Sequence, residues 1–153
     1  MNNFLSILFA IVDSKVWNIS RVVAWADQLI AKLDSPKTWL LDLSISDSID
    51  SCLEVIREAM RESGVSLPGD FGELMAGFIL IRFDNGELSE ETARSYLVDV
   101  VDAYGTNSID AEAVATLSLN SSVYSAFRQN AEQVLIYVSK GQFLETEQNL
   151  VNG

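Results

Sequence analysis

The sequence offers two arrangements of acidic side chains that could do chemistry. Asp99 and Asp102 would lie one helical turn apart, where they could act as a general acid and base or as metal ligands. The stretch DNGELSEE opens at Asp84 like a calcium-binding loop, but the alternating ligands are missing and Ser95 stands where the final Glu is needed. Exposed carboxylates on a helix are usually only solvated. We therefore predict no catalytic residue, no metal site and no cofactor.

The residue types that are missing exclude most other catalytic sites. The chain has no histidine, which excludes Ser-His-Asp and Cys-His triads, histidine-containing zinc sites and the Glu-x-x-His pairs of di-iron bundles. The glycines form neither a phosphate-binding loop nor a dinucleotide fingerprint. Cys52, the only cysteine, is in register with an apolar helix face and is predicted to be a core residue. We predict that the protein is not an enzyme; a carboxylate-dependent enzyme using Asp99 and Asp102 is the alternative.

Acidic residues dominate the charge of the chain. It holds 22 Asp and Glu against 10 Lys and Arg, a formal net charge of −12. Nucleic-acid phosphate and anionic membranes would repel such a protein, so we expect a basic protein partner, no direct nucleic-acid binding and no membrane association. The alternative is that acidity only keeps the protein dispersed. A single cysteine allows no intrachain disulfide, and the cytoplasm is the default location.

The excess of acid is concentrated in one segment. Between Asp84 and Glu112 there are eight acidic residues against Arg94 alone, so this segment carries −7 of the total −12. Like charges on one surface repel one another in the free protein, and a basic partner would turn that repulsion into attraction. We predict that the partner binds these eight residues: Asp84, Glu87, Glu90, Glu91, Asp99, Asp102, Asp110 and Glu112.

Helical periodicity of apolar residues runs through nearly the whole chain, and capping residues divide it into segments. The pattern predicts helices near residues 4–12, 20–34, 36–43, 47–63, 70–83, 89–104, 109–117 and 121–139, with a further turn or two over 143–151. There is no internal repeat and no linker rich in Gly, Ser or Pro, and the length suits one domain. We therefore predict an all-α fold, a single domain over residues 1–153 with about seven or eight helices.

The helix near residues 70–83 is expected at the centre of this fold. Asp70 and Glu73 have the spacing of a capping box, and the run FGELMAGFILIRF carries only Glu73 and Arg82 as charges. A helix that is apolar nearly all round must be buried. A strand at FILIRF is the alternative, because Phe and Ile also favour sheets. The cap before this run and the DNG sequence after it favour the helix.

Two tryptophans flank a predicted corner between helices. Ser35 and Pro36 can cap and open the short helix that carries Trp39, directly after the helix that carries Trp25. We predict that both rings pack in the core at this corner. A buried indole N–H needs a hydrogen-bond acceptor, for which Asp27, Asp42 or a helix-end carbonyl is available. The alternative is an exposed pair that anchors a partner.

Three helices also have predicted faces. On helix 47–63, a solvated ladder of mixed sign is expected: Glu54, Arg57, Glu58, Arg61 and Glu62. On helix 89–104, one stripe should face the core: Ala93, Tyr96, Leu97, Val100, Val101 and Tyr104. Its opposite face should point into solvent: Glu91, Arg94, Ser95, Asp99 and Asp102. Val123 is expected among the apolar residues of the last long helix.

The stretch VVAWADQLIAKL, followed by PKTWLLDLS, carries a family resemblance. A small, acidic, helical protein with these features resembles the immunity proteins that bacteria pair with contact-dependent growth-inhibition toxins and related polymorphic toxins. The likeness covers mainly residues 16–62. It implies a cytosolic antidote that binds and blocks its own lineage's toxin domain, commonly a basic nuclease, with an RNase as the preferred class. The alternative is a helical adaptor or scaffold that binds another protein through an apolar groove.

Overall fold

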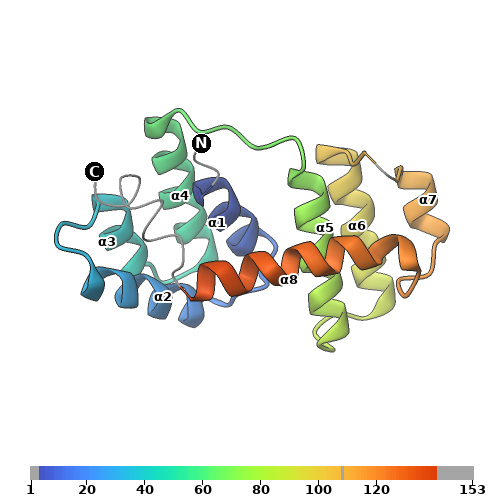
Figure 1. Ribbon diagram of the computed structural model, residues 1–153, viewed down its shortest axis with the longest axis horizontal. Helices are drawn as coiled ribbons and strands as arrows, with labels where there is room; N and C mark the ends of the chain where they lie inside the picture. Colours follow the sequence, from blue (N-terminus) through green and yellow to red (C-terminus); the bar gives the residue numbers. More distant parts are fainter. Residues whose placement is uncertain (1–3, 108, 141–153) are drawn as a thin grey trace. The chain divides into compact units, whose positions relative to one another are not determined.

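The computed structural model describes residues 4–107 and 109–140, and all regular secondary structure in these residues is helical. The described residues form eight α-helices and one short 3-10 helix, in this order: α1 (Phe4–Asp13), α2 (Ile19–Lys32), α3 (Thr38–Ser44), α4 (Ile49–Ser63), α5 (Phe71–Asp84), α6 (Glu90–Tyr104), α7 (Ala111–Thr116), η1 (Ser122–Tyr124) and α8 (Ser125–Ser139). Figure 1 labels the α-helices. The all-α prediction is confirmed. The strand alternative at FILIRF is wrong, because these residues belong to α5. The turn predicted over 143–151 lies outside the described residues.

Contacts divide the chain into two compact units. The first unit comprises the described residues of Met1–Leu67 and Leu135–Gly153, and the second comprises those of Pro68–Val134. The boundary therefore falls within α8. Domain organisation over residues 1–153 stays a prediction.

The first unit is built on the apolar N-terminal helix. Eight of the ten residues of α1 are buried, as its run of aliphatic and aromatic side chains predicts. Helix α1 packs against α4, α2 packs against α3, and α3 packs against α4. Helix α4 ends at Gly64, whose φ of 68° is the left-handed conformation that glycine adopts at helix ends.

In the second unit, α5 is the buried helix predicted near residues 70–83. Nine of its 14 residues are buried, in an almost unbroken run from Phe71 to Leu80. Helix α5 packs against α6, and α6 packs against α7. The backbone of α8 passes close to Gly77, where a side chain would collide with Phe127 and Ala131. Because α5 is apolar nearly all round, it can pack against both α6 and α8 within the second unit.

Three helix starts differ from the predicted caps. Helix α3 begins at Thr38 without a side-chain cap, so Ser35 does not cap it. Helix α4, predicted from residue 47, begins at Ile49 and is capped by Ser48, because the extended backbone of Ser48 lets its hydroxyl accept a hydrogen bond from the Ser51 N–H. Asp70 occupies the N-cap position of α5 but makes no capping bond, since its ψ of 16° departs from the extended conformation that a cap requires.

The two tryptophans of the predicted corner are buried to different extents. Trp25 is only 5% exposed, and its indole N–H donates to the carbonyl oxygen of Val138, 3.2 Å away in the last turn of α8. This confirms a core position and a helix-end acceptor for Trp25. Trp39 is only half-buried, and Phe4 lies between the two rings, 5.9 Å from Trp25 and 6.5 Å from Trp39. Trp17, which the sequence analysis did not place, is 3% exposed and packs against Trp25.

Three side chains predicted in the core are exposed instead: Tyr96, Tyr104 and Val123. Tyr96 lies at the edge of the apolar stripe of α6, where its ring is 42% exposed. Tyr104, at the end of the same helix, makes an edge-on contact with Phe71 at 4.7 Å but keeps 40% of its surface exposed. Val123 belongs to η1, whose tighter turn takes it out of the period of α8.

Candidate functional site

The eight acidic residues of the predicted docking segment all lie in the second unit, and all are exposed. They extend from the last residue of α5, through α6, to the first turn of α7. Some of these acids form ion pairs or stabilise helix N-termini within the protein, and others do neither. That a partner binds here stays a prediction.

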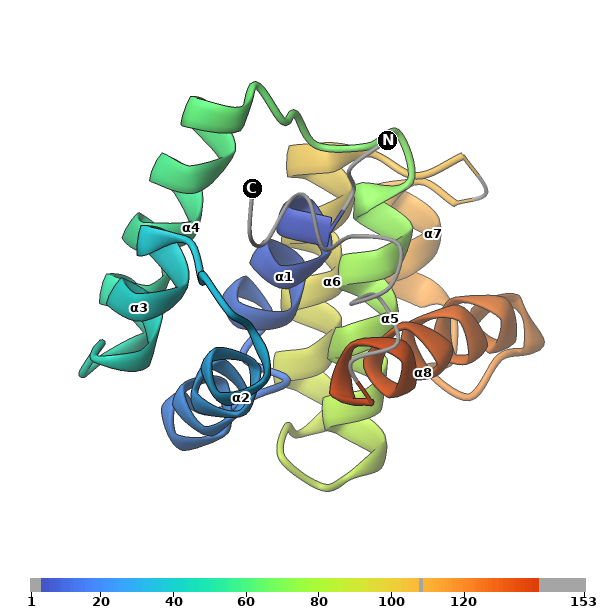
Figure 2. The same cartoon turned by 60° about the vertical axis from the view of Figure 1, so that its left-hand side comes forward.

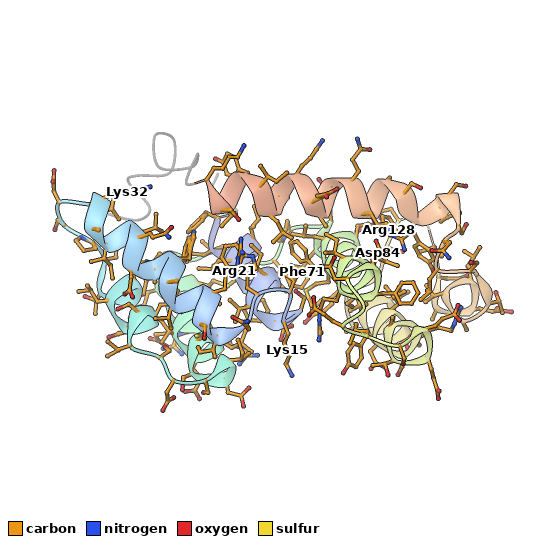
Figure 3. The ribbon with its side chains drawn as sticks, turned by 90° about the horizontal axis from the view of Figure 1, so that it is seen from below. Lys15, Arg21, Lys32, Phe71, Asp84 and Arg128 are labelled. Atoms are coloured by element: carbon orange, nitrogen blue, oxygen red, sulfur yellow. The ribbon has the colours of Figure 1, made fainter. Side chains whose placement is uncertain are left out.

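Ion pairs neutralise part of this segment. The guanidinium of Arg128 on α8 donates to both carboxylate oxygens of Asp84, from Nε at 2.8 Å and from Nη2 at 3.1 Å (Figure 3). The charge of −7 counted along the sequence leaves out Arg128, because this residue lies 44 positions from Asp84 in the chain. The count therefore overstates the negative charge of the segment in the folded protein. Two more acids have arginine partners: Glu87 pairs with Arg82 at 3.4 Å, and Glu90 with Arg94 at 3.3 Å.

Three further acids stabilise helix N-termini. The carboxylate of Asp110 accepts a hydrogen bond from the Ala113 N–H at 2.8 Å and so caps α7. Glu112 lies in the first turn of α7 and Glu91 in the first turn of α6, where negative charge interacts favourably with the helix dipole. Asp110 is therefore a structural residue as well as a predicted contact.

Asp99 and Asp102 have no such role. Both side chains are exposed, and neither has a hydrogen-bond or ion-pair partner among the described residues. Asp102 lies in the last turn of α6, which contains no basic residue. A carboxylate at this end of the dipole costs a few tenths of a kcal/mol. The two residues thus add repulsion to the free protein that no internal contact removes.

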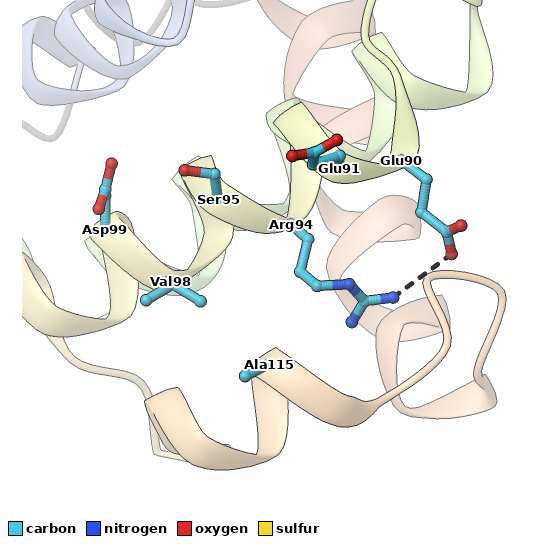
Figure 4. A pocket seen from close by; sticks show the side chains of 7 residues that line it. All are labelled: Glu90, Glu91, Arg94, Ser95, Val98, Asp99 and Ala115. Atoms are coloured by element: carbon cyan, nitrogen blue, oxygen red, sulfur yellow. Dashed lines mark hydrogen bonds and ion pairs between the residues drawn. The ribbon is translucent and has the colours of Figure 1, made fainter.

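An open groove of about 570 Å³ runs between α6 and α7 beside this stripe (Figure 4). Its lining combines three acids and one arginine with small apolar and polar groups: Glu90, Glu91, Arg94, Ser95, Val98, Asp99 and Ala115. Figure 4 shows Val98 and Ala115 facing each other across the groove. The carboxylates of this lining suit the charged end of a lysine or arginine, and Val98 and Ala115 suit its aliphatic stem.

Comparisons with protein-family models, with curated proteins and with solved structures found no match for this chain. In the part of the chain that the structure describes, no three acidic or cysteine side chains are grouped to hold a metal ion. No helix within that part is long and apolar enough to cross a membrane. Cys52 is fully buried, and burial raises the pKa of its thiol, as expected of a core residue.

Arg94 holds the two walls of the groove together, contrary to the prediction that it faces solvent. Its Nη1 donates to the carbonyl oxygens of Val114 at 2.9 Å and Leu117 at 2.6 Å, at the end of α7. Terminal carbonyls of a helix lack partners within the helix, and a six-residue helix has few others. The side chain reaches these carbonyls from α6, so Arg94 fixes α7 against α6.

We expect Arg94→Gln to lower the free energy of unfolding by about 2 kcal/mol, because it leaves two carbonyls without a charged donor. Hydrogen exchange should rise most over residues 111–117. Urea unfolding and exchange mass spectrometry measure the two effects. Arg61→Gln is the control: the Arg61 side chain is 76% exposed and pairs with Glu58 on the surface of α4, so its loss should cost under about 0.5 kcal/mol. Equal costs for both variants would contradict the role of Arg94.

Proposed function

We propose that this protein is the immunity protein of a bacterial contact-dependent growth-inhibition or related polymorphic toxin system. It binds and blocks a basic toxin domain in the cytoplasm through its acidic surface. The toxin is a nuclease in this proposal, with an RNase preferred. Two independent arguments support it: the charge distribution of the second unit and the resemblance carried by residues 16–62.

The observation that carries the proposal is the absence of available positive charge on the second unit. Residues 68–134 contain eleven acids, three arginines and no lysine. Each of the three arginines, Arg82, Arg94 and Arg128, is already paired with an acid. The stripe of Glu91, Asp99 and Asp102 on α6 has no ion-pair partner among the described residues. A basic surface brought to this stripe would supply the missing cations.

Inhibition would follow from competition with nucleic acid. A nuclease holds its substrate through lysines and arginines that contact phosphates. Carboxylates of Glu91, Asp99 and Asp102 would occupy those cations in place of the phosphates. Tyr96, 42% exposed and one turn from Asp99, offers the aromatic contact that protein interfaces use as an energetic anchor.

Charge reversal on α6 tests the proposal. The triple variant Glu91→Lys, Asp99→Lys, Asp102→Lys should slow association with the inactivated toxin domain encoded beside this gene about tenfold at low salt. Raising the salt concentration should shrink the difference, since exposed charges are screened beyond roughly 8–10 Å at physiological ionic strength. Stopped-flow mixing measures the rate constants. Growth of cells that co-express the active toxin reports neutralisation.

The matched control reverses three exposed acids elsewhere: Asp27→Lys, Asp34→Lys and Glu132→Lys. This triple variant changes the net charge equally and should slow association less than threefold. If both triples slow association alike, overall charge rather than α6 guides binding. If neither does, or if the neighbouring gene product is not toxic, the proposed function is wrong.

The predicted alternative, an adaptor that binds through an apolar groove, has one observation in its favour. Leu41 on α3 and Ile45, the residue that follows the end of α3, are 42% and 80% exposed, and they are four residues apart in the chain. This face belongs to the first unit and is distinct from the acidic stripe of α6. It does not explain the charge of the second unit, so the adaptor remains the second candidate.

A further inference from the structure

Helices α3 and α4 of the first unit lie side by side (Figure 2). A second groove, of about 500 Å³, is lined by side chains of these two helices. Its lining is part apolar and part acidic: Thr38, Trp39, Asp42, Glu54, Val55, Glu58, Ala59 and Glu62. Leu41 and Ile45 extend the apolar surface along the outside of α3, and Ile45 is the most exposed of the large apolar side chains that the structure describes. The groove and this ridge are together termed the α3–α4 surface.

All five residues of the solvated ladder of mixed sign predicted on α4 are exposed, as expected. Among the described residues, the arginines of this ladder pair with only one acid of the α3–α4 surface, Glu58. Arg57 turns toward α1, where its guanidinium lies 5.3 Å from the centre of the Phe9 ring. Arg61 pairs with Glu58, and both side chains are largely exposed.

Carboxylates crowd along the groove. Glu54, Glu58 and Glu62 follow one another at four-residue spacing, so each lies one turn from the next on the same face of α4. Like charges at this spacing destabilise a helix by roughly 0.2–0.5 kcal/mol per pair. Asp42 adds a fourth carboxylate from α3. Asp42, Glu54 and Glu62 have no ion-pair partner among the described residues.

Trp39 gives the groove an aromatic wall. One side of the ring packs near Phe4, with centroids 6.5 Å apart, and the side chain is only half-buried. An indole ring attracts a cation held over its face, and carboxylates around it strengthen that attraction. The same contact occurs inside this protein, where the Arg21 guanidinium lies 4.9 Å from the centre of the Trp17 ring.

Charge decides what can cover the α3–α4 surface. A second copy of this chain would bring the same carboxylates face to face, and an anionic lipid surface would be repelled. A nucleic acid would be repelled for the same reason. A segment with both aliphatic and cationic side chains matches the apolar ridge and the acids together.

We propose that the α3–α4 surface docks a basic, amphipathic helix of a protein partner. A lysine or arginine of that helix lies over Trp39, between the carboxylates of Asp42 and Glu54. Its aliphatic residues cover Leu41 and Ile45. This inference goes beyond the proposed function, because it concerns a different unit and holds whether or not α6 binds a toxin.

Fluorescence quenching of the unmodified full-length protein provides the first test. Trp17 and Trp25 are 3% and 5% exposed, so quenchers in solution reach mainly Trp39. With each quencher normalised to free N-acetyltryptophanamide, caesium ion should quench the protein at least twice as efficiently as iodide, because the carboxylates concentrate cations at the ring. Equal quenching, or stronger quenching by iodide, would overturn the inference.

The second test uses a synthetic 14-residue peptide with leucines at helical spacing and arginines elsewhere, and a counterpart with glutamates in place of the arginines. The arginine peptide should protect Trp39 from acrylamide quenching, and the glutamate peptide should not. Glu54→Gln combined with Glu62→Gln should weaken peptide binding about fivefold, as expected for two exposed pairs. Leu41→Ser combined with Ile45→Ser should weaken it to a similar extent.

The control is Asp99→Asn combined with Asp102→Asn, which removes the same charge from the second unit and should change peptide affinity less than twofold. Thermal unfolding confirms that each variant folds. If the control weakens binding as much as the α4 variant, or if the serine variant binds unchanged, the inference is overturned. Neither outcome bears on toxin neutralisation, which the lysine variants of α6 test separately.

Discussion

Replacing Trp25 with alanine should lower the free energy of unfolding by about 4 kcal/mol, the largest loss that we expect from any single substitution in the first unit. The ring is 5% exposed and contacts the rings of Phe4 and Trp17. Its N–H also donates to the Val138 carbonyl near the end of α8. The substitution leaves a cavity in the core and a carbonyl without its donor.

Two further variants separate these contributions. Trp25→Phe keeps an aromatic ring and loses the hydrogen bond, so it should cost only about 1–2 kcal/mol. Trp39→Ala should cost about 2 kcal/mol, because that ring is half-buried and less apolar surface returns to water. Urea unfolding measures all three. Equal losses for Trp25→Ala and Trp39→Ala would contradict the difference in burial.

The sequence predicts the helices of this protein well because their signals are local. Asn18 and Ser89 accept hydrogen bonds from backbone N–H groups three residues ahead, which depends only on neighbouring residues. The burial of α5 follows from its own composition, which is apolar on every side.

Long-range contacts account for what the sequence did not predict. Glu73 has the spacing of a capping box with Asp70, yet its carboxylate accepts a hydrogen bond from the Asn107 N–H, 34 residues away. Arg94 has the register of a solvent-facing residue, yet it bonds to the carbonyls at the end of α7. Neither partner can be identified from periodicity, because periodicity describes one helix at a time.

In the candidate sites, too, the sequence predicts what depends on local signals and misses what depends on long-range contacts. Helical register predicts that the side chains of Asp99 and Asp102 point into solvent, and both are exposed in the structure. The pairing of Asp84 with Arg128 depends on how α8 packs. The α3–α4 surface was not anticipated, because Trp39 and Glu54 belong to different helices and their proximity requires the fold. A count of charges along the sequence therefore finds an acidic region, but it does not show which of its carboxylates lack an ion pair and can bind a partner.

Gly77→Ala should destabilise the protein by about 3 kcal/mol, although alanine is normally about 1 kcal/mol better than glycine inside a helix. A methyl group at this position of α5 would lie 2.6 Å from the Cβ of Ala131 and closer still to the carbonyl oxygen of Phe127, both on α8. The nearest obstacle is backbone, which cannot rotate away as a long side chain does. The two helices would have to separate and lose apolar contacts on both sides.

Gly69→Ala is the matched control, because nothing lies within 4 Å of the added methyl group there. That variant should change the free energy of unfolding by less than about 0.5 kcal/mol. Thermal and urea unfolding of both variants measure the difference. If Gly77→Ala proves as stable as the unmodified protein, α8 does not approach α5 as closely as the collision requires. If the variant is instead more stable by about the 1 kcal/mol that alanine normally gains over glycine in a helix, residue 77 faces open space and α8 does not pack against α5 there.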